Sequence, residues 1–195
     1  MTIMEPTTPA DFSFPPKSGP VRVVLLGAES TGKTTLCRAL AAAYSTAWVP
    51  EYGRQLTEEK NGALDFADHL RIARRHIEIE NDMAAQARRF LFVDTNAITT
   101  ALYSYYYYQG CDPALLALVR ACRTRYAHTL VCQPSIPFEA DGWRGPEALR
   151  TVQQGTTLMQ LDFLGIPYTC VDGSVAERVR QVRAVLGKGG GSFGF

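Results

Sequence analysis

The residues best suited to chemistry in this sequence lie between Gly27 and Thr35. They read Gly-Ala-Glu-Ser-Thr-Gly-Lys-Thr-Thr and match G-x-x-x-x-G-K-[ST], the pattern of a phosphate-binding P-loop. Its two glycines let the backbone turn tightly and approach phosphate oxygens, and the amides between them form an anion nest. The predicted nucleotide-binding residues are Gly27, Glu29, Ser30, Thr31, Gly32, Lys33, Thr34 and Thr35.

The residues on both sides of this loop support the interpretation. Residues 21–26 form a nearly continuous apolar run, as in a buried parallel strand, and Leu36 and Leu40 recur at helical spacing after it. The N-terminus of that helix adds a positive dipole to the loop. Lys33 is predicted to act on the β- and γ-phosphates, and the Thr34 hydroxyl to bind Mg²⁺. We therefore expect a nucleoside triphosphate with Mg²⁺ at this loop.

Two carboxylates follow predicted strands. Asp94 comes after the apolar run 90–93, where it could orient the Mg²⁺ shell, accept a proton from a substrate hydroxyl, or cap the next helix. Glu51 follows the short apolar run 47–49, where it could hold sugar hydroxyls, share the role of base, or form a surface salt bridge with Arg54. Because ligands bind at the carboxyl ends of parallel strands, we expect both acids to lie near the P-loop.

The elements that must position these residues alternate along the chain. Strands are predicted at 21–26, 47–49, 90–93, 127–132 and 167–171. Helices are predicted from the P-loop to about 45, over 65–88, from 97 to a stop at Gly110, and over 113–123, 147–164 and 174–187. This order predicts an α/β fold with a doubly wound parallel sheet of about five strands, which together with the P-loop indicates the P-loop NTPase/kinase class. The charged residues of the second helix are interpreted as a solvated face: Arg71, Arg74, Arg75, Glu78 and Glu80.

A small lid is predicted at about 136–150. Arg144 and Arg150 lie there, and arginines that close over a transferring phosphoryl group stabilise its charge, although Arg150 is equally interpretable as an exposed residue. Most of the tyrosines between Tyr103 and Tyr108 must pack or face solvent, because successive helical residues point apart. The predicted domain organisation is a flexible Pro-rich tail over 1–20, the kinase domain over 21–187, and a flexible Gly-rich tail over 188–195.

Composition narrows the choice of partners and compartment. The 195 residues carry a net charge of +1, which argues against a nucleic-acid partner, and the three histidines show no metal-ligand spacing. Five scattered cysteines without a C-x-x-C pair indicate reduced thiols. Neither a secretory signal nor an apolar run of membrane-spanning length is present. We therefore predict a cytoplasmic protein that acts on a small molecule, with no membrane association.

Four stretches together resemble one family, the ribosylnicotinamide kinase domain of the NadR-type NAD-biosynthesis proteins. They are the P-loop with its Glu29-Ser30 pair, residues 51–54 (Glu-Tyr-Gly-Arg), residues 92–100 (Phe-Val-Asp-Thr-Asn-Ala-Ile-Thr-Thr) and residues 141–144 (Asp-Gly-Trp-Arg). The resemblance extends from Val21 to Leu186. One departure is Asn96, where the family often has an aspartate.

This resemblance implies ATP-dependent phosphorylation of the 5′-hydroxyl of nicotinamide riboside, which yields nicotinamide mononucleotide. It implies Asp94 and Glu51 near the ribose and Mg²⁺, and Arg144 in the lid. The substrate residues that it implies are Glu51, Tyr52, Arg54, Asp94 and Asn96. Two alternatives stay open: a kinase for another nucleoside or a phosphorylated metabolite, and a regulatory ATP-binding protein without an acceptor. The absence of an N-K-x-D motif weighs against a GTPase switch.

Overall fold

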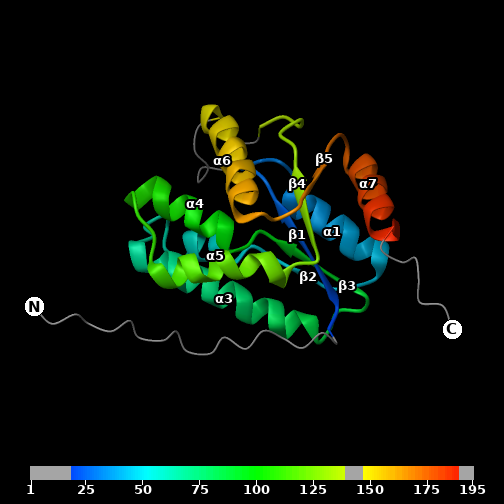
Figure 1. The fold of residues 1–195 in the computed structure, drawn as a ribbon, viewed down its shortest axis with the longest axis horizontal. Helices are drawn as coiled ribbons and strands as arrows, with labels where there is room; N and C mark the ends of the chain where they lie inside the picture. The colour runs from blue at the N-terminus through cyan, green and yellow to red at the C-terminus, as the bar shows by residue number, and fades with distance from the viewer. Residues whose placement is uncertain (1–18, 139–146, 189–195) are drawn as a thin grey trace, which may run out of the picture.

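The computed structural model describes residues 19–138 and 147–188 (Figure 1). The predicted tails therefore lie almost wholly outside the described residues, as do the central part of the predicted lid and Arg144. No helix in the described ranges has the length and apolar composition needed to cross a bilayer.

A five-stranded parallel sheet forms the centre of the molecule. The strands are β1 (Val21–Leu26), β2 (Trp48–Val49), β3 (Phe90–Asp94), β4 (His128–Cys132) and β5 (Thr169–Val171). Their spatial order is β2-β3-β1-β4-β5, so β1 lies between β3 and β4. The chain moves outward from β1 in both directions, which makes the sheet doubly wound as predicted. The carboxyl ends of all five strands meet at one edge.

Seven helices are present in the described part of the chain, and most of them cover the two faces of the sheet. α1 (Lys33–Tyr44) and α7 (Val175–Lys188) pack on one face, and their core includes Leu36, Leu40 and Val182. The opposite face is covered by α3 (Phe66–Ala84), α4 (Ala97–Tyr108), α5 (Pro113–Arg125) and α6 (Ala148–Leu164), and the two groups lie on either side of the strands in Figure 1.

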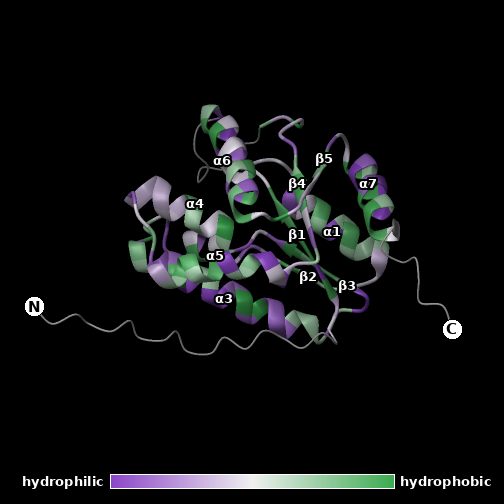
Figure 2. Ribbon diagram, in the orientation of Figure 1, coloured by the Kyte–Doolittle hydropathy of each residue, from purple (hydrophilic) through white to green (hydrophobic). Residues whose placement is uncertain are grey.

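Alternation along the strands explains the two cores. In β1, Val23 and Leu25 pack with α1 and α7, whereas Val24 and Leu26 face the other helices. Since successive side chains of a strand point to opposite faces, a continuous apolar run fills both layers. Figure 2 shows apolar strands at the centre and polar residues on the outer faces of the helices.

The helix boundaries agree with the predicted signals at most ends. Asp65 caps α3 in a reciprocal capping box with Asp68, and Ser174 and Glu177 form a second capping box at the start of α7. Four C-terminal ends differ: α3 stops at Ala84 rather than 88, left-handed Gln109 caps α4 before Gly110, α5 extends to Arg125 rather than 123, and α7 extends one residue past Gly187.

One helix was not predicted, α2 (Tyr52–Glu59). It buries only Leu56, so its sequence carries no apolar stripe by which periodicity could reveal it. Its place against α3 brings residues 51–58 to the edge of the sheet that carries the P-loop.

The interpretation of Glu80 as part of a solvated face was wrong. Glu80 is fully buried, and its carboxylate accepts hydrogen bonds from Arg125 Nε at 2.8 Å and from the Tyr126 hydroxyl at 2.7 Å. Arg22 Nε lies 3.7 Å from the same carboxylate. The other four residues interpreted in this way are exposed: Arg71, Arg74, Arg75 and Glu78. Glu80 alone among the five is buried, because it meets two arginines from other elements.

We predict that Glu80→Ala lowers the free energy of unfolding by about 3–5 kcal/mol, because it leaves two arginines buried without their carboxylate. Glu78→Ala is the matched control on the same helix, since the Glu78–Arg75 pair is exposed and its loss should leave stability close to that of the wild type. Urea denaturation of both variants measures the difference, and an equal, small effect at the two positions would contradict the prediction.

Candidate active site

The P-loop connects β1 to α1 and requires glycine at both ends. Gly27 has φ +132°, and a Cβ added there would lie 2.6 Å from the carbonyl oxygen of Cys132. Gly32 has φ +79°, in the left-handed region that favours glycine. Ser30 also has a positive φ of 53°, which is uncommon for a residue with a Cβ. The loop is thus a strained turn held by its surroundings.

Two glutamines from α6 bind the first amides of the loop. The Ala28 amide donates to Gln154 Oε1 at 2.9 Å, and the Glu29 amide donates to Gln153 Oε1 at 3.1 Å. Both glutamines are buried. They satisfy the amides that lie before the tight part of the turn.

Two buried arginines bind the next carbonyl groups of the loop. Arg150 of α6 donates to the Ser30 oxygen at 2.8 Å, and Arg178 of α7 donates to the Thr31 oxygen at 2.5 Å. In a trans peptide the N–H points opposite to the C=O. The arginines therefore turn the amides of Thr31 and Gly32 away from α6 and α7, toward the centre of the loop.

The first turn of α1 completes this set of amides. Its first N–H groups have no acceptor within the helix, as at every helix N-terminus. Lys33 Nζ lies 3.0 Å from the Gly27 oxygen and 2.7 Å from the Ala28 oxygen, inside the turn. Inward amides, a helix N-terminus and an ammonium group together form an anion site suited to a polyphosphate.

The structure agrees with neither interpretation of Arg150, as an arginine that closes over the phosphoryl group or as an exposed residue. Arg150 is 6% exposed, and it donates to the backbone of Ser30 and Ile136. It therefore supports the P-loop from behind, and Arg144 lies outside the described residues.

A cavity of about 860 Å³ joins the P-loop to α2, α3 and α4. This volume is in the range of sites that enclose whole small molecules. The predicted site residues that line it are Glu29, Ser30, Thr31, Gly32, Lys33, Thr34, Thr35, Glu51, Arg54 and Asn96. Gly27, Tyr52 and Asp94 are not in its wall.

Asp94 lies beneath the floor of this cavity and is fully buried. The Thr34 hydroxyl donates to Asp94 Oδ2 at 2.5 Å, whereas Asp94 Oδ1 is sealed from solvent without a hydrogen-bond partner. Burial raises the pKa of this carboxyl group, and the nearby Lys33 ammonium opposes the shift. A buried carboxylate with an unsatisfied oxygen beside a threonine hydroxyl fits Mg²⁺, which takes one or two protein ligands together with phosphate oxygens and water.

Glu51 differs from Asp94 because it lines the cavity. Burial, with a smaller contribution from the charge of Asp94, raises the pKa of Glu51 to about 7. A carboxyl group with such a pKa can accept a proton near neutral pH. Neighbouring Arg54 contacts Glu58 Oε1 at 3.1 Å, and both side chains line the cavity and are about half exposed.

Asn96 has a structural role that explains the residue type. Its side-chain oxygen accepts a hydrogen bond from the Ile98 amide at 2.9 Å and caps α4. Asparagine and aspartate cap helices about equally well, so the departure from an aspartate at this position preserves the local fold. The preceding Thr95 has φ +68°, so backbone strain lies between Asp94 and the cap.

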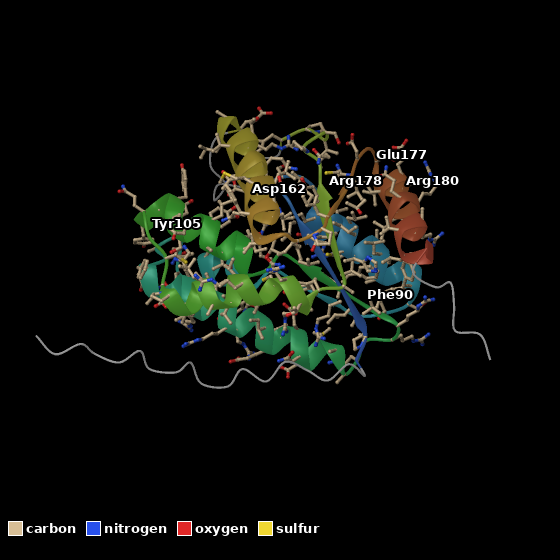
Figure 3. The ribbon with its side chains drawn as sticks, in the orientation of Figure 1. Phe90, Tyr105, Asp162, Glu177, Arg178 and Arg180 are labelled. Carbon is tan, nitrogen blue, oxygen red and sulfur yellow. The ribbon has the colours of Figure 1, made fainter. Side chains whose placement is uncertain are left out.

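Tyrosines form the wall of the cavity that lies on α4. The Tyr103 hydroxyl donates to Glu29 Oε1 at 2.7 Å, and its ring stacks on that of Tyr107 with centroids 6.2 Å apart. Tyr108 also lines the cavity, and its hydroxyl donates to the Leu64 oxygen. Tyr105 instead projects from α4 into solvent, as Figure 3 shows. The run thus divides between cavity and surface, as helical geometry requires.

Several residues that support the site were not identified from the sequence. Arg178, shown in Figure 3 at the start of α7, is 2% exposed and also binds the Gln133 carbonyl oxygen, and Gln153 and Gln154 bind the loop from α6. The sequence contains one signal for the two glutamines, which is their spacing from Arg150. Arg150, Gln153 and Gln154 share one face of a helix otherwise expected to bury apolar residues.

The P-loop, the parallel sheet with the loop at its carboxyl edge, and the adjoining cavity define a P-loop nucleotide-binding domain. Comparison with known families agrees: residues 22–178 match the AAA domain family, and the chain belongs to it.

The similar proteins include two curated bacterial relatives. The chain is 31% identical over 177 residues to the trifunctional NAD biosynthesis/regulator protein NadR of Escherichia coli, and 28% identical over 179 residues to that of Salmonella typhimurium. These matches cover 85% and 86% of the chain. The chain spans less than half of each relative, 43% in both cases.

Solved structures confirm the fold. A NadR protein in complex with NR matches 86% of this chain and 52% of its own, with a TM-score of 0.72 and 23% identity. A NadR protein with NAD and AMP-PNP matches 90% of this chain and 51% of its own, with a TM-score of 0.69 and 22% identity. The thymidylate kinase of Candida albicans is more distant, with a TM-score of 0.58 and 15% identity over 88% of this chain and 92% of its own.

The raised pKa of Glu51 predicts a specific pH dependence of stability. Between its ordinary value of 4.5 and about 7, the folded state holds a proton that the unfolded state has released. The free energy of unfolding therefore falls as pH rises through this window. In Glu51→Gln this loss is absent, so the variant gains stability relative to the wild type from pH 5 to pH 8.

Thermal unfolding at several pH values measures this difference. Glu59→Gln, which removes an exposed carboxylate from the same helix, is the control and should follow the wild-type curve. Parallel curves for the wild type and Glu51→Gln would rule out the raised pKa.

Proposed function

We propose that this chain is an ATP-dependent kinase that phosphorylates the 5′-hydroxyl of nicotinamide riboside and thereby supplies nicotinamide mononucleotide for NAD biosynthesis. The observation that carries the proposal is the continuous cavity that begins at the P-loop and passes Glu51. A phosphate donor and a sugar alcohol would meet in one cavity. The relatives named above, a NAD biosynthesis protein and a NadR protein in complex with NR, support the choice of acceptor.

The donor end of the cavity suits the triphosphate of ATP. The inward amides of the P-loop and the Lys33 ammonium would neutralise the β- and γ-phosphates. Thr34 and Asp94 would hold Mg²⁺, because their oxygens meet beneath the phosphate site and one carboxylate oxygen of Asp94 is unsatisfied. When bound, this ion supplies Lewis-acid stabilisation of charge on the transferring phosphoryl group.

The acceptor end would use Glu51 as the base. The positions of the two carboxylates support a division of the roles that the sequence left open. Asp94 is sealed beneath the floor and is better placed to hold the metal, whereas Glu51 faces the cavity with a pKa of about 7. Glu51 would accept the proton of the 5′-hydroxyl as the hydroxyl oxygen attacks the γ-phosphorus, while the bond from the γ-phosphorus to the bridging oxygen of the β-phosphate breaks and ADP leaves.

The remaining predicted substrate residues are weaker candidates. Arg54 and Asn96 line the acceptor part of the cavity, and Asn96 is already used as a helix cap. Tyr52 lies at the start of α2 and is not in the cavity wall. Arg144 stays a predicted lid residue, to be tested by substitution.

Incubation of the protein with Mg-ATP and a panel of nucleosides tests the proposal directly. We expect mass spectrometry to detect a monophosphate product from nicotinamide riboside, with ADP formed only when the acceptor is present. Lys33→Ala should abolish transfer while thermal unfolding shows a folded protein, because the lost ammonium contacts phosphates. Slow ADP release that no acceptor accelerates would instead indicate a regulatory ATPase, and a product from another nucleoside alone would reassign the acceptor.

Substitution of the buried acid tests its proposed role as a metal holder. We predict that Asp94→Asn lowers kcat by about 100-fold or more, with a much smaller change in ATP affinity, because the amide keeps the shape but lacks the charge that holds Mg²⁺. Turnover measured over a range of Mg²⁺ concentrations should recover in part at high concentration. Equal losses in turnover and ATP affinity, without any Mg²⁺ dependence, would contradict this role.

A further inference from the structure

His69 is a buried polar residue in the wall of the cavity, and no role has yet been assigned to it. It lies on α3, is 2% exposed, and packs edge-on against the Tyr108 ring with centroids 5.6 Å apart. Both residues line the same cavity as Glu51 and the P-loop.

One nitrogen of the His69 ring is already paired. Nδ1 lies 3.1 Å from the carbonyl oxygen of Asp65, one helical turn earlier. Because a carbonyl oxygen only accepts hydrogen bonds, Nδ1 must carry the proton. In the neutral ring, Nε2 then has a lone pair and acts as an acceptor.

The other nitrogen is available to a ligand. Among the described residues, Nε2 of His69 has no hydrogen-bond partner, and unlike Nε2 of His76 it is not sealed from solvent. Since His69 is almost completely buried and lines the cavity, the cavity is the space that this nitrogen can reach. A polar atom left unpaired in such a wall weakens binding unless the ligand satisfies it.

The spacing of residues along α3 gives the distance between His69 and the end of the cavity near Asp94. His76, two turns further along the same face, lies near the backbone of Thr95 and the charge of Asp94. Seven residues at 1.5 Å each place His69 about 10 Å from that level. This length is comparable to the span of a nucleoside from its 5′-oxygen to the far edge of its base. A riboside with its 5′-hydroxyl at the acids is therefore long enough for its base to reach His69.

We propose that His69 determines the specificity of the acceptor site, by accepting a hydrogen bond from the carboxamide on position 3 of the pyridine ring. The proposal rests on the proposed function and extends it to one substituent of the substrate. An amide N–H satisfies the Nε2 lone pair. The corresponding 3-carboxylate carries only acceptor oxygens, so it would leave the lone pair facing negative charge. The site is therefore selective for the amide over the acid.

Steady-state kinetics with both ribosides, the 3-carboxamide and the 3-carboxylate, test this assignment. We expect the wild type to prefer the amide by about tenfold or more in kcat/KM, as in sites that reject an analogue lacking a hydrogen-bonding group. His69→Phe keeps an aromatic ring but removes the acceptor, so the preference should fall to near unity through loss of activity with the amide. His69→Gln, whose terminal amide can turn to offer either a donor or an acceptor, should restore activity with the amide and improve activity with the acid.

Three controls separate the possible outcomes. His128→Gln, at the start of β4 and away from the cavity, should keep the wild-type preference. Binding of an ATP analogue and thermal unfolding report whether each variant is folded. A wild type that phosphorylates the amide while His69→Phe and His69→Gln keep its full preference would overturn the role of His69 alone. A wild type that phosphorylates neither riboside would overturn the proposed function, and the role of His69 with it.

Discussion

The orientation of a few peptide groups in the P-loop is the constraint on which the site depends. An anion nest forms only if successive amides point inward, and their carbonyl groups must then be satisfied from outside. Arg150 and Arg178 bind two of these carbonyl groups, and Gln153 and Gln154 bind the two amides that precede the nest. Helices α6 and α7 thus contribute to phosphate binding without facing the phosphates.

A second constraint is the close approach of like charges. Glu51 and Asp94 interact across the floor of the cavity, and burial raises the pKa of both carboxyl groups. Lys33 opposes both shifts, so the ammonium that would bind phosphate also helps to keep the acids ionised. Strained Ser30 and Thr95 lie beside these groups, and their backbone conformations persist because the surrounding core fixes them.

Local patterns were sufficient to predict most of the architecture. An apolar run, two glycines and a lysine specify the strand, loop and helix from residue 21 to 44, because each depends on neighbours a few residues away. Asp65 and Asp112 cap the helices that were predicted to begin at 65 and 113, and a cap likewise depends only on residues two or three positions away. Helix α2 escaped prediction because it buries a single leucine, and its position depends on α3 rather than on its own periodicity.

By itself, the amino-acid sequence determined the strand order along the chain, the phosphate-binding loop and the two acids that follow strands. Tertiary structure alone decided which polar residues became buried. Gln153 meets Glu29 across 124 positions of sequence, and Glu80 meets Arg125 across 45. Periodicity describes a residue relative to its own helix, whereas a hydrogen bond between elements depends on how those helices pack. That is the physical reason why Glu80 and Arg150 look like surface residues in the sequence and are internal in the fold.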